Sequence, residues 1–215
     1  MLELGLKLLI AYLAGSVMGS LLLGRLRGVD IRELGSGNAG GTNALRTQGA
    51  AFAIGVIVID VGKGVLPVLL LPGMALPGVP LDPAIPRALV IYGCALAAIL
   101  GHIWPLWYEF RGGKGAATAI GVIAVLAPTL VLPMLLVWLA IVFTSGIVSL
   151  GTMSAAAIAP LLVALGWPVA LEGFFWFALI VATLMLYTHR SNIARLRAGT
   201  EHRVARLMLF RRRSG

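Results

Sequence analysis

Long apolar segments alternate with short polar and glycine-rich segments along the whole chain. Nearly continuous apolar runs cover residues 4–23, 50–71, 88–107, 116–144, 150–165 and 169–187. A helix that crosses the roughly 30 Å hydrocarbon core of a bilayer needs about 20 such residues. The pattern therefore predicts an all-α, polytopic integral membrane protein with its polar segments at the membrane faces.

The run 116–144 is too long for a single span. Its 29 residues would form a helix about 43 Å long, which exceeds the thickness of the core. Pro128 and Pro133 lie inside this run and favour a break into two short spans. With this division the chain has about seven transmembrane helices.

The distribution of basic residues favours seven spans over six. Seven spans place three basic segments on one side of the membrane: a loop with Arg25 and Arg46, a loop with Arg111 and Lys114, and the arginine-rich tail. Because Lys and Arg gather in cytoplasmic loops, we predict an outside N-terminus and a cytoplasmic C-terminus. We expect one membrane-embedded domain over residues 1–215. Its cytoplasmic site segments would lie at about 25–49, 108–115, 144–149 and 188–215.

Composition supports a membrane protein and changes how the charge is interpreted. Of the 215 residues, 60% are hydrophobic and 12% are charged, whereas about 25% are charged in a soluble domain. Mean hydropathy is +0.99. The net charge of +9 is explained more simply by the cytoplasmic bias of basic residues than by nucleic-acid binding. Cys94 is the only cysteine and lies in an apolar run, so we expect a packing role and neither a disulfide nor a cysteine-based metal site.

The polar segment 35–46 is the best candidate for a binding site. Its glycines can take positive φ and turn successive N–H groups toward one point, as in many phosphate sites. These glycines are Gly35, Gly37, Gly40 and Gly41. Side-chain donors and a planar cation accompany them: Ser36, Asn38, Thr42, Asn43 and Arg46. A flexible connector is the alternative, but similar clusters at 111–115 and 189–192 favour one anion site at one membrane face.

Ionisable residues inside the apolar runs have two interpretations. Asp60 and Lys63 are three residues apart, so they share one helix face and can pair. Because charges inside a membrane are costly, a functional role is the default and a purely structural pair is the alternative. His102 either lines the site or packs in the core. Lys7 is close enough to the end of its span to reach the headgroups, and the proline-rich segment 72–86 is a stiff connector.

Several enzyme signatures are absent from the sequence. Residues 113–115 lack the Ser or Thr that follows the lysine of a P-loop. There is no Gly-x-Ser-x-Gly elbow, and no histidine has an aspartate five residues later, as soluble-type acyltransferases require. The cytoplasmic carboxylates form no paired cluster, which disfavours magnesium-dependent phosphotransfer. What remains is a site rich in phosphate-binding groups that acts on an already activated substrate.

Motifs in four places follow one another along the chain. The first is Ser36-Gly37-Asn38 with Thr42-Asn43-x-x-Arg46, and the second is Asp60-x-x-Lys63-Gly64. The third is Gly101-His102-x-x-Pro105 followed by Phe110-Arg111-Gly112-Gly113-Lys114-Gly115, and the fourth runs from His189-Arg190-x-Asn192 to Gly199-Thr200-Glu201. Together they resemble the successive motifs of the PlsY family of bacterial acyl-phosphate:glycerol-3-phosphate acyltransferases. Gly146 stands where that family usually carries an arginine.

This resemblance implies a reaction and a role for each residue. The enzyme would transfer a fatty acyl group from acyl phosphate to the 1-hydroxyl of glycerol 3-phosphate, giving lysophosphatidic acid and phosphate in the first step of bacterial phospholipid synthesis. Because acyl phosphate is already activated, no cofactor and no metal are expected, and catalysis would rest on positioning and charge stabilisation. The implied catalytic residues are Ser36, Lys114 and His189. Substrate binding is assigned to Gly37, Asn38, Thr42, Asn43, Arg46, Ser149 and Asn192. A supporting role falls to Asp60, Lys63, His102, Gly112 and Gly113.

The resemblance also implies where the protein works and with what. It places the protein in the bacterial cytoplasmic (inner) membrane, with the active site facing the cytoplasm. The expected partners are acyl phosphate, glycerol 3-phosphate and membrane lipid, and no nucleic acid. A transporter for a small phosphorylated solute is the alternative, with Asp60 and Lys63 lining a pathway. The gathering of polar motifs on one face, and the lack of an evident inverted repeat, count against it.

Overall fold

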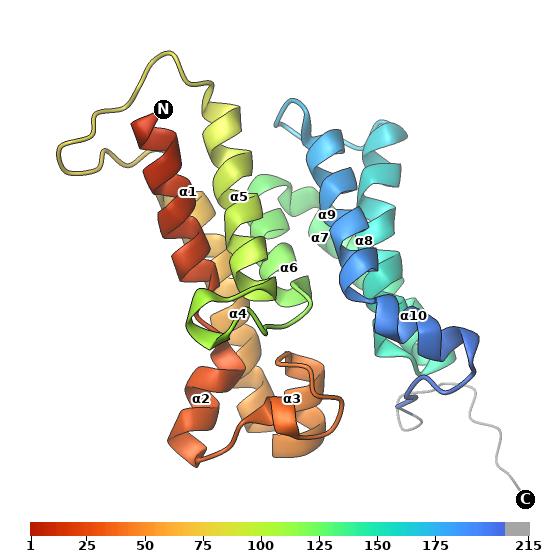
Figure 1. The fold of residues 1–215 in the computed structure, drawn as a ribbon. Coiled ribbons are helices and arrows are strands. Elements are labelled where there is room, and N and C mark those ends of the chain that lie inside the picture. Colours follow the sequence, from red (N-terminus) through yellow and green to blue (C-terminus); the bar gives the residue numbers. More distant parts are fainter. Residues whose placement is uncertain (205–215) are drawn as a thin grey trace, which may run out of the picture. The chain divides into compact units, whose positions relative to one another are not determined.

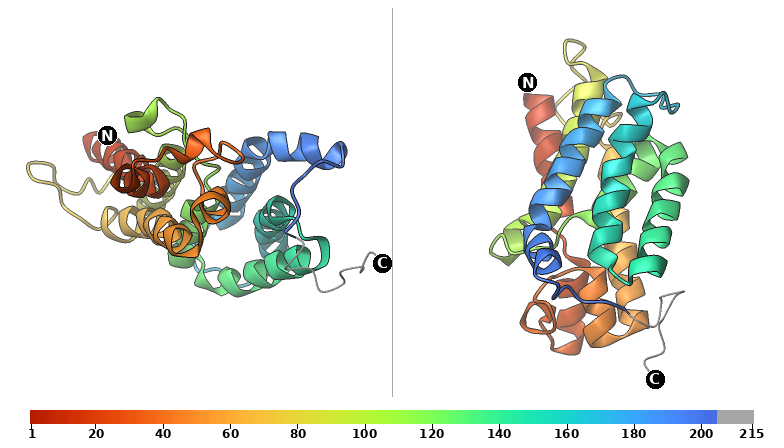
Figure 2. Two further views of the ribbon diagram at one scale, coloured as in Figure 1. Left: turned by 90° about the horizontal axis from the view of Figure 1, so that it is seen from below. Right: turned by 90° about the vertical axis from the view of Figure 1, so that its right-hand side faces the viewer.

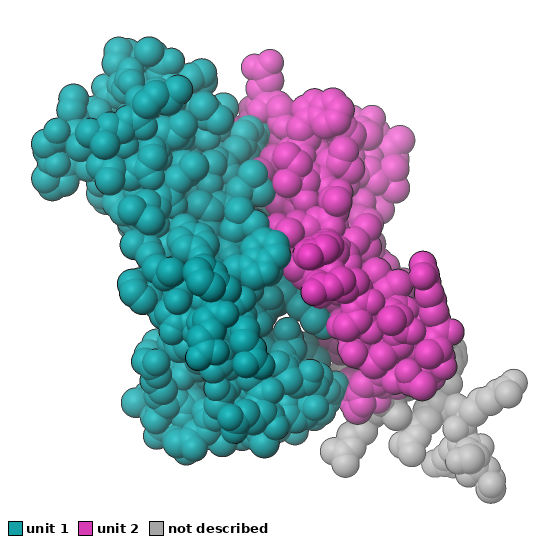
Figure 3. Space-filling model, viewed as in Figure 1, with its two compact units in different colours: residues 1–126 teal, residues 127–215 magenta. Residues whose placement is uncertain are grey.

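A computed structural model describes residues 1–204 of the chain, and these residues form helices and connecting loops without a β-strand. The chain divides into two compact units, residues 1–126 and residues 127–215 (Figure 3). An all-helical fold is thus confirmed. Within a bilayer a helix satisfies all its backbone hydrogen bonds internally, which suits a chain of this hydrophobicity.

Unit 1 contains six α-helices and two short 3₁₀ turns in its described sequence (Figure 1). The helices are α1 Leu2–Gly15, α2 Gly19–Arg27, α3 Gly41–Gln48, α4 Ala50–Leu70, α5 Arg87–Ile103 and α6 Ala116–Leu126. The 3₁₀ turns are η1 Ile31–Glu33 and η2 Leu106–Tyr108.

Unit 2 begins at the predicted proline break. After η3 Pro128–Leu130, its helices are α7 Val131–Ser145, α8 Val148–Ala164, α9 Phe174–Thr188 and α10 Arg190–Arg197. Helix α8 packs against both α7 and α9, and the three run side by side (Figure 2). The division of the run 116–144 into two helices is therefore confirmed, with the break at Ala127.

Each predicted apolar run forms helix, but two runs differ from the expectation. The run 4–23 is not one straight helix, because α1 and α2 meet at a 42° bend. In the run 169–187 the helix begins only at Phe174. By length and composition, three helices of residues 1–204 can cross a membrane, or up to five spans if the bent pairs α1 with α2 and α9 with α10 each count as one.

Small residues let the helices of unit 1 approach closely. A Cβ added at Gly15 of α1 would overlap the backbone of Ala98 in α5, and one at Gly101 would overlap the carbonyl of Tyr12. The same holds for Gly64 of α4 against Thr118 of α6. Close backbone approach at small residues is a major source of helix association in lipid.

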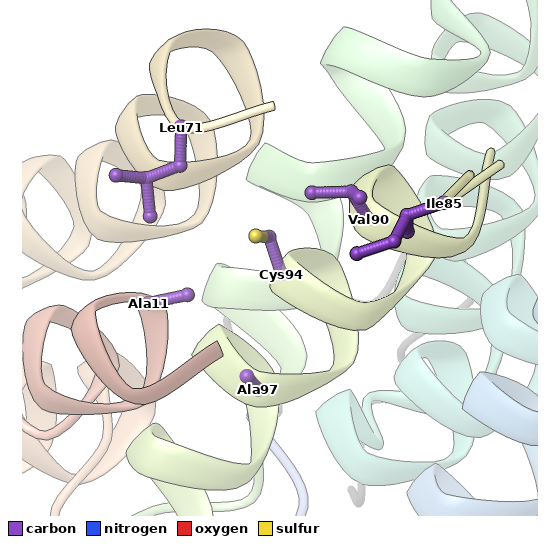
Figure 4. Close-up of a cluster of buried hydrophobic side chains, with 6 residues drawn as sticks. All are labelled: Ala11, Leu71, Ile85, Val90, Cys94 and Ala97. Atoms are coloured by element: carbon purple, nitrogen blue, oxygen red, sulfur yellow. The ribbon is translucent and has the colours of Figure 1, made fainter. Parts of the chain in front are cut away.

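A hydrophobic cluster fills the space among α1, α4 and α5 (Figure 4). It consists of Ala11, Leu71, Ile85, Val90, Cys94 and Ala97. Cys94 is fully buried there and has no disulfide partner in the described chain. Its predicted role as a small core residue is confirmed.

Lys7 does not reach the headgroups as predicted, because it is completely buried. Its Nζ lies 2.7 Å from Glu3 Oε1 and donates to the carbonyl of Pro72 at 3.1 Å. Arg87 also binds Glu3, at 2.6 Å, and the Asp82 N–H donates to the same carboxylate. The prediction for Lys7 was wrong because the carboxylate one turn earlier and a distant carbonyl satisfy the ammonium group inside the protein. The network also ties the connector 72–86 to α1 and α5.

Candidate active site

The glycine-rich segment forms a turn followed by a short helix. Gly35 and Gly37 take φ values of +59° and +70°, so positive φ is confirmed at these two positions. Gly40 and Gly41 differ from the expectation, because Gly40 is the extended N-cap of α3 and Gly41 is its first residue. The segment is therefore a turn at residues 34–37 that leads into a helix N-terminus.

Asn43 holds this turn in place from inside. Its side chain is 1% exposed. The Oδ1 atom accepts from the Ser36 N–H at 2.9 Å, and Nδ2 donates to the carbonyls of Ile31 and Leu34 at 2.9 and 3.0 Å. Both amide protons are thus used, so the geometry indicates that Asn43 shapes the loop, whereas the sequence had suggested substrate contact.

Other polar residues of the segment face outward. Ser36, Gly37, Thr42 and Arg46 are exposed, and Asn38 is half-buried. Thr42 and Arg46 are four residues apart on α3 and therefore lie on one face of that helix. The turn and this face together present the Ser36 and Thr42 hydroxyls and the Arg46 guanidinium to the surroundings. Hydroxyl and guanidinium groups of this kind bind phosphate oxygens.

The second glycine cluster folds back on the end of α5. The Gly112 N–H donates to the carbonyl of Ile103 at 3.2 Å, and the Gly113 N–H donates to that of His102 at 3.1 Å. A Cβ at Gly112 would overlap the His102 carbonyl, and one at Gly113 would overlap the His102 ring. Both glycines are therefore needed for close approach, and the loop satisfies carbonyls that the end of α5 leaves open. Lys114 follows directly and is half-buried, just before α6 begins.

The two loops of unit 1 contact each other. Arg32, which is paired with Asp30 at 2.6 Å, donates from Nη1 to the carbonyl of Tyr108 at 3.3 Å. Ala39 is buried beside Met18 in a cluster that also includes Tyr108. The Arg32 guanidinium holds the pKa of the Asp30 carboxyl below its ordinary value, so the pair is charged near neutral pH. The segments that carry the first two polar clusters therefore contact each other through Arg32, Ala39 and Tyr108.

Beneath these loops lies a buried group of ionisable side chains. Lys63 Nζ is 3.2 Å from Asp60 Oδ1, so the predicted pairing is confirmed. His102 Nδ1 lies 3.7 Å from the same oxygen. All three side chains are buried, and Asp60 Oδ2 and His102 Nδ1 have no hydrogen-bond partner within residues 1–204. His102 thus packs between Asp60 and Gly113.

In unit 2 two of the predicted site residues, Ser149 and Asn192, bind Glu201, which the sequence reasoning did not assign to the site. Ser149 Oγ and Asn192 Nδ2 donate to Glu201 Oε1 at 2.8 and 2.6 Å, and Arg195 Nε donates to Oε2 at 2.7 Å. Burial raises the pKa of Glu201, but the three donors outweigh it, so the pKa lies below its ordinary value. The available signal was that Glu201 is the only acid after Glu172, in a tail rich in arginine.

His189 and Gly146 occupy the ends of helices in the same unit. His189 caps α9, and its Nδ1 lies 2.7 Å from the carbonyl of Met185. Gly146 ends α7 with φ of +73°, and its carbonyl accepts from the Val204 N–H at 2.8 Å. A left-handed residue after a helix favours glycine, which gives a local reason for Gly146 at this position.

The remaining expectations concern metal ligands and the basic tail. Within residues 1–204, no group of three or more His, Cys, Asp and Glu side chains is placed to hold a metal ion. The tail arginines after position 204, namely Arg206, Arg211, Arg212 and Arg213, lie outside the described residues.

Over residues 1–204, the apolar helices and the glycine-rich loops define an all-helical, multi-pass membrane protein. A family model described as "Glycerol-3-phosphate acyltransferase" matches residues 5–199. The chain belongs to this family, and the resemblance to PlsY is confirmed.

Individual relatives and solved structures agree with this placement. Glycerol-3-phosphate acyltransferase 2 of Moorella thermoacetica is 44% identical, over 93% of this chain and 96% of that protein. Glycerol-3-phosphate acyltransferase of Myxococcus xanthus is 46% identical, over 91% and 96%. The crystal structure of PlsY (YgiH), an integral membrane glycerol 3-phosphate acyltransferase in its glycerol 3-phosphate form, superimposes with a TM-score of 0.79. That structure has 36% identity and covers 93% of this chain and 94% of its own. The lysophosphatidic acid form of the same protein gives a TM-score of 0.77.

Proposed function

We propose that this protein transfers a fatty acyl group from acyl phosphate to the 1-hydroxyl of glycerol 3-phosphate, giving lysophosphatidic acid and phosphate. The observation that carries the proposal is the loop pair of unit 1. One loop presents Ser36, Thr42 and Arg46 outward, and it contacts the loop that carries Lys114. Family membership and the solved glycerol 3-phosphate form of a similar protein support the same substrate.

The chemistry requires little beyond positioning. The 1-hydroxyl oxygen attacks the acyl carbonyl carbon, an ester C–O bond forms, and the anhydride C–O bond to phosphate breaks. The hydroxyl proton leaves with the departing phosphate or with solvent. Both substrates carry phosphoryl groups, so convergent donors and cations hold them and stabilise the charge that develops.

Roles for the named residues follow from this scheme. We assign catalytic contacts to Ser36 and Lys114, and phosphate binding to the outward groups Gly37, Asn38, Thr42 and Arg46. Asn43, His102, Gly112 and Gly113 shape the loops. Catalysis by His189 and substrate binding by Ser149 and Asn192 stay predictions. The side chains of Ser149 and Asn192 both form hydrogen bonds to Glu201, which supports their assignment to a polar site.

The proposal includes a topology. We infer seven spans in one membrane-embedded domain of the bacterial inner membrane, with the site and the C-terminus on the cytoplasmic side. Three long apolar helices, two bent pairs and the shorter apolar helices α6 and α8 together would supply the seven. The positions of the basic loops support the orientation.

The test is an assay of the purified protein with acyl phosphate and glycerol 3-phosphate, scoring phosphate release and lysophosphatidic acid formation. We expect turnover with acyl phosphate, none with acyl-CoA or acyl carrier protein alone, and the same rate in a metal chelator. Efficient turnover with acyl-CoA would contradict the donor assignment. A rate that collapses in chelator would contradict the metal-free mechanism.

A further inference from the structure

Gly-Ser pairs at residues 15–16 and 19–20 accompany the bend between α1 and α2, and Ser16 Oγ donates to the Tyr12 carbonyl at 2.9 Å, but α2 has no side-chain cap of its own. The chain turns by 42° there although residues 15–19 contain no proline. Helix α2 has no side-chain hydrogen bond at its N-cap Met18, and α1 has no basic residue in its last turn. Open N–H and C=O groups at a helix break are costly inside a bilayer, so this break needs partners from elsewhere.

Helix α4 supplies both partners. Asp60 Oδ1 accepts from the Gly19 N–H at 3.1 Å, and Lys63 Nζ donates to the Val17 carbonyl at 2.6 Å. The carboxylate thus lies at the N-terminus of α2, and the ammonium group lies at the C-terminal end of α1. Each charge complements the helix dipole that it meets. A single buried ion pair therefore caps the break on both sides.

The break in turn sets the place of the first loop. Ser20, in the first turn of α2, donates from Oγ to the carbonyl of Ala39 at 2.8 Å. Met18, Leu21 and Ala39 are buried together in one cluster. Because Ala39 lies between the turn that carries Ser36 and the start of α3, a shift of α2 would carry the whole glycine segment with it.

Asp60 is also connected to the second loop, through His102 at the end of α5. His102 lies between Asp60 and Gly113, and the next residue is Lys114. Thr118, in the first turn of α6, donates to the backbone carbonyl of Asp60 at 3.0 Å. The turn of α4 that carries Asp60 and Lys63 therefore contacts the residues that hold both loops of the proposed site in place.

We propose that Asp60 and Lys63 are positioning residues, which set the geometry of both substrate loops by capping the break between α1 and α2. They act through Gly19, Val17 and His102 rather than by touching substrate, because both side chains are buried. The expected effect on kcat/KM rests on the proposed function. The claim that the pair caps the helix break does not.

The experiment replaces the pair as a unit, because removing one partner leaves a lone buried charge, which is strongly destabilising. Asp60→Leu with Lys63→Met replaces both charged groups by apolar side chains and removes both caps. The control is Glu3→Gln with Lys7→Met, which disrupts another buried pair of unit 1 that does not contact the break. We expect kcat/KM for glycerol 3-phosphate to fall at least about tenfold in the test variant, mainly through KM, and to stay within about twofold in the control.

Hydrogen exchange measured by mass spectrometry gives a readout independent of activity. In the test variant, exchange should accelerate in residues 19–46 and 109–118 and stay unchanged in 71–87. In the control the pattern should be reversed. A third variant, Asp60→Asn with Lys63→Met, keeps an oxygen acceptor for the Gly19 N–H and should fall between the wild type and the apolar pair in both measurements.

The outcomes separate this inference from the proposed function. Unchanged exchange in residues 19–46, an unchanged kcat/KM, or equal effects of Asn and Leu at position 60 would each overturn the positioning role. A wild-type protein without acyltransferase activity would overturn the proposed function alone, since the exchange pattern still decides whether the pair caps the break.

Discussion

At the scale of single residues, the polar groups of unit 1 divide into those that build the loops and those that the loops present. Asn43 is buried and donates both amide protons to backbone carbonyls, whereas Thr42 and Arg46 on the same short helix are exposed. The amphipathic spacing of a helix produces this division, because positions four apart share a face and position 43 lies on another. Residue type alone does not distinguish the two roles.

Arg46 and Lys114 test the phosphate-binding role directly. Removing either cation leaves phosphoryl charge uncompensated in a partly dehydrated site, so Arg46→Ala and Lys114→Ala should each lose roughly 30- to 1,000-fold in rate, or about 2–4 kcal/mol. Arg46→Lys keeps the charge but loses the planar fork, and should also fall markedly. Steady-state kinetics at low glycerol 3-phosphate measures this.

The control for these variants is Arg197→Ala, which removes an exposed arginine of α10 outside the two loops. It should retain the wild-type rate. Near wild-type turnover in folded Arg46→Ala and Lys114→Ala would show that these residues are not the phosphate clamp.

Gly113 tests the close approach of the second loop to α5. An added Cβ would overlap the His102 ring, so Gly113→Ala should displace the loop and cost about 1–3 kcal/mol of stability, as overpacking does. Activity should fall more than tenfold because Lys114 is the next residue. Gly62→Ala is the matched control, since nothing lies within 4 Å of that position on α4. Equal behaviour of the two variants in melting and turnover would argue against the packing constraint.

At the scale of elements, both units have side chains that hold separate segments together. In unit 2, Glu201 joins Ser149 of α8 to Asn192 and Arg195 of α10. The carboxylate side chain is 7% exposed. Three donors on one carboxylate make the ionised form the stable one, so the contact depends on pH.

Glu201 therefore predicts an acid-sensitive contact. Its pKa is lower in the folded protein than in the unfolded chain, so its contribution is complete above the unfolded pKa of about 4.3 and is lost as pH falls through the folded pKa. Glu201→Gln should be less stable than the wild type at pH 7, and the difference should shrink below about pH 4.5. Melting temperatures in detergent between pH 7 and pH 3 measure this. A difference that stays constant across that range would contradict the prediction.

At the scale of the whole molecule, the topology follows from the number of spans. An odd number of spans puts the termini on opposite sides, and the basic loops then share the side of the C-terminus. Counting α6 and α8 as spans requires short helices to be shielded by neighbours or by local thinning of the bilayer.

Cysteine labelling tests this topology. In a Cys94→Ala background, a cysteine placed after Gly215 should react only from the cytoplasmic side, and one placed before Leu4 only from the outside. The physical reason is that seven spans put the two ends on opposite sides of the bilayer. Labelling of both positions from one side would refute seven spans, and activity of each variant confirms that the protein is inserted correctly.

Local patterns in the sequence determined much of this protein. The apolar runs, the proline break near residue 128, the pairing of Asp60 with Lys63 and the left-handed turn at Gly35 and Gly37 could all be predicted. Each depends on the properties of one helix or one turn: the length that spans a bilayer, the three- to four-residue repeat, and the conformational freedom of glycine.

Only the tertiary structure decided what joins segments distant in sequence. It assigned the Pro72 carbonyl to Lys7, the hydrogen bonds of Asn43, and the need for Gly112 and Gly113 beside His102. It also placed Glu201 among its three donors. These contacts connect residues up to 65 positions apart in the case of Lys7 and Pro72. No local period encodes such a contact, because burial of a polar group is tolerated only where the fold brings a partner to it.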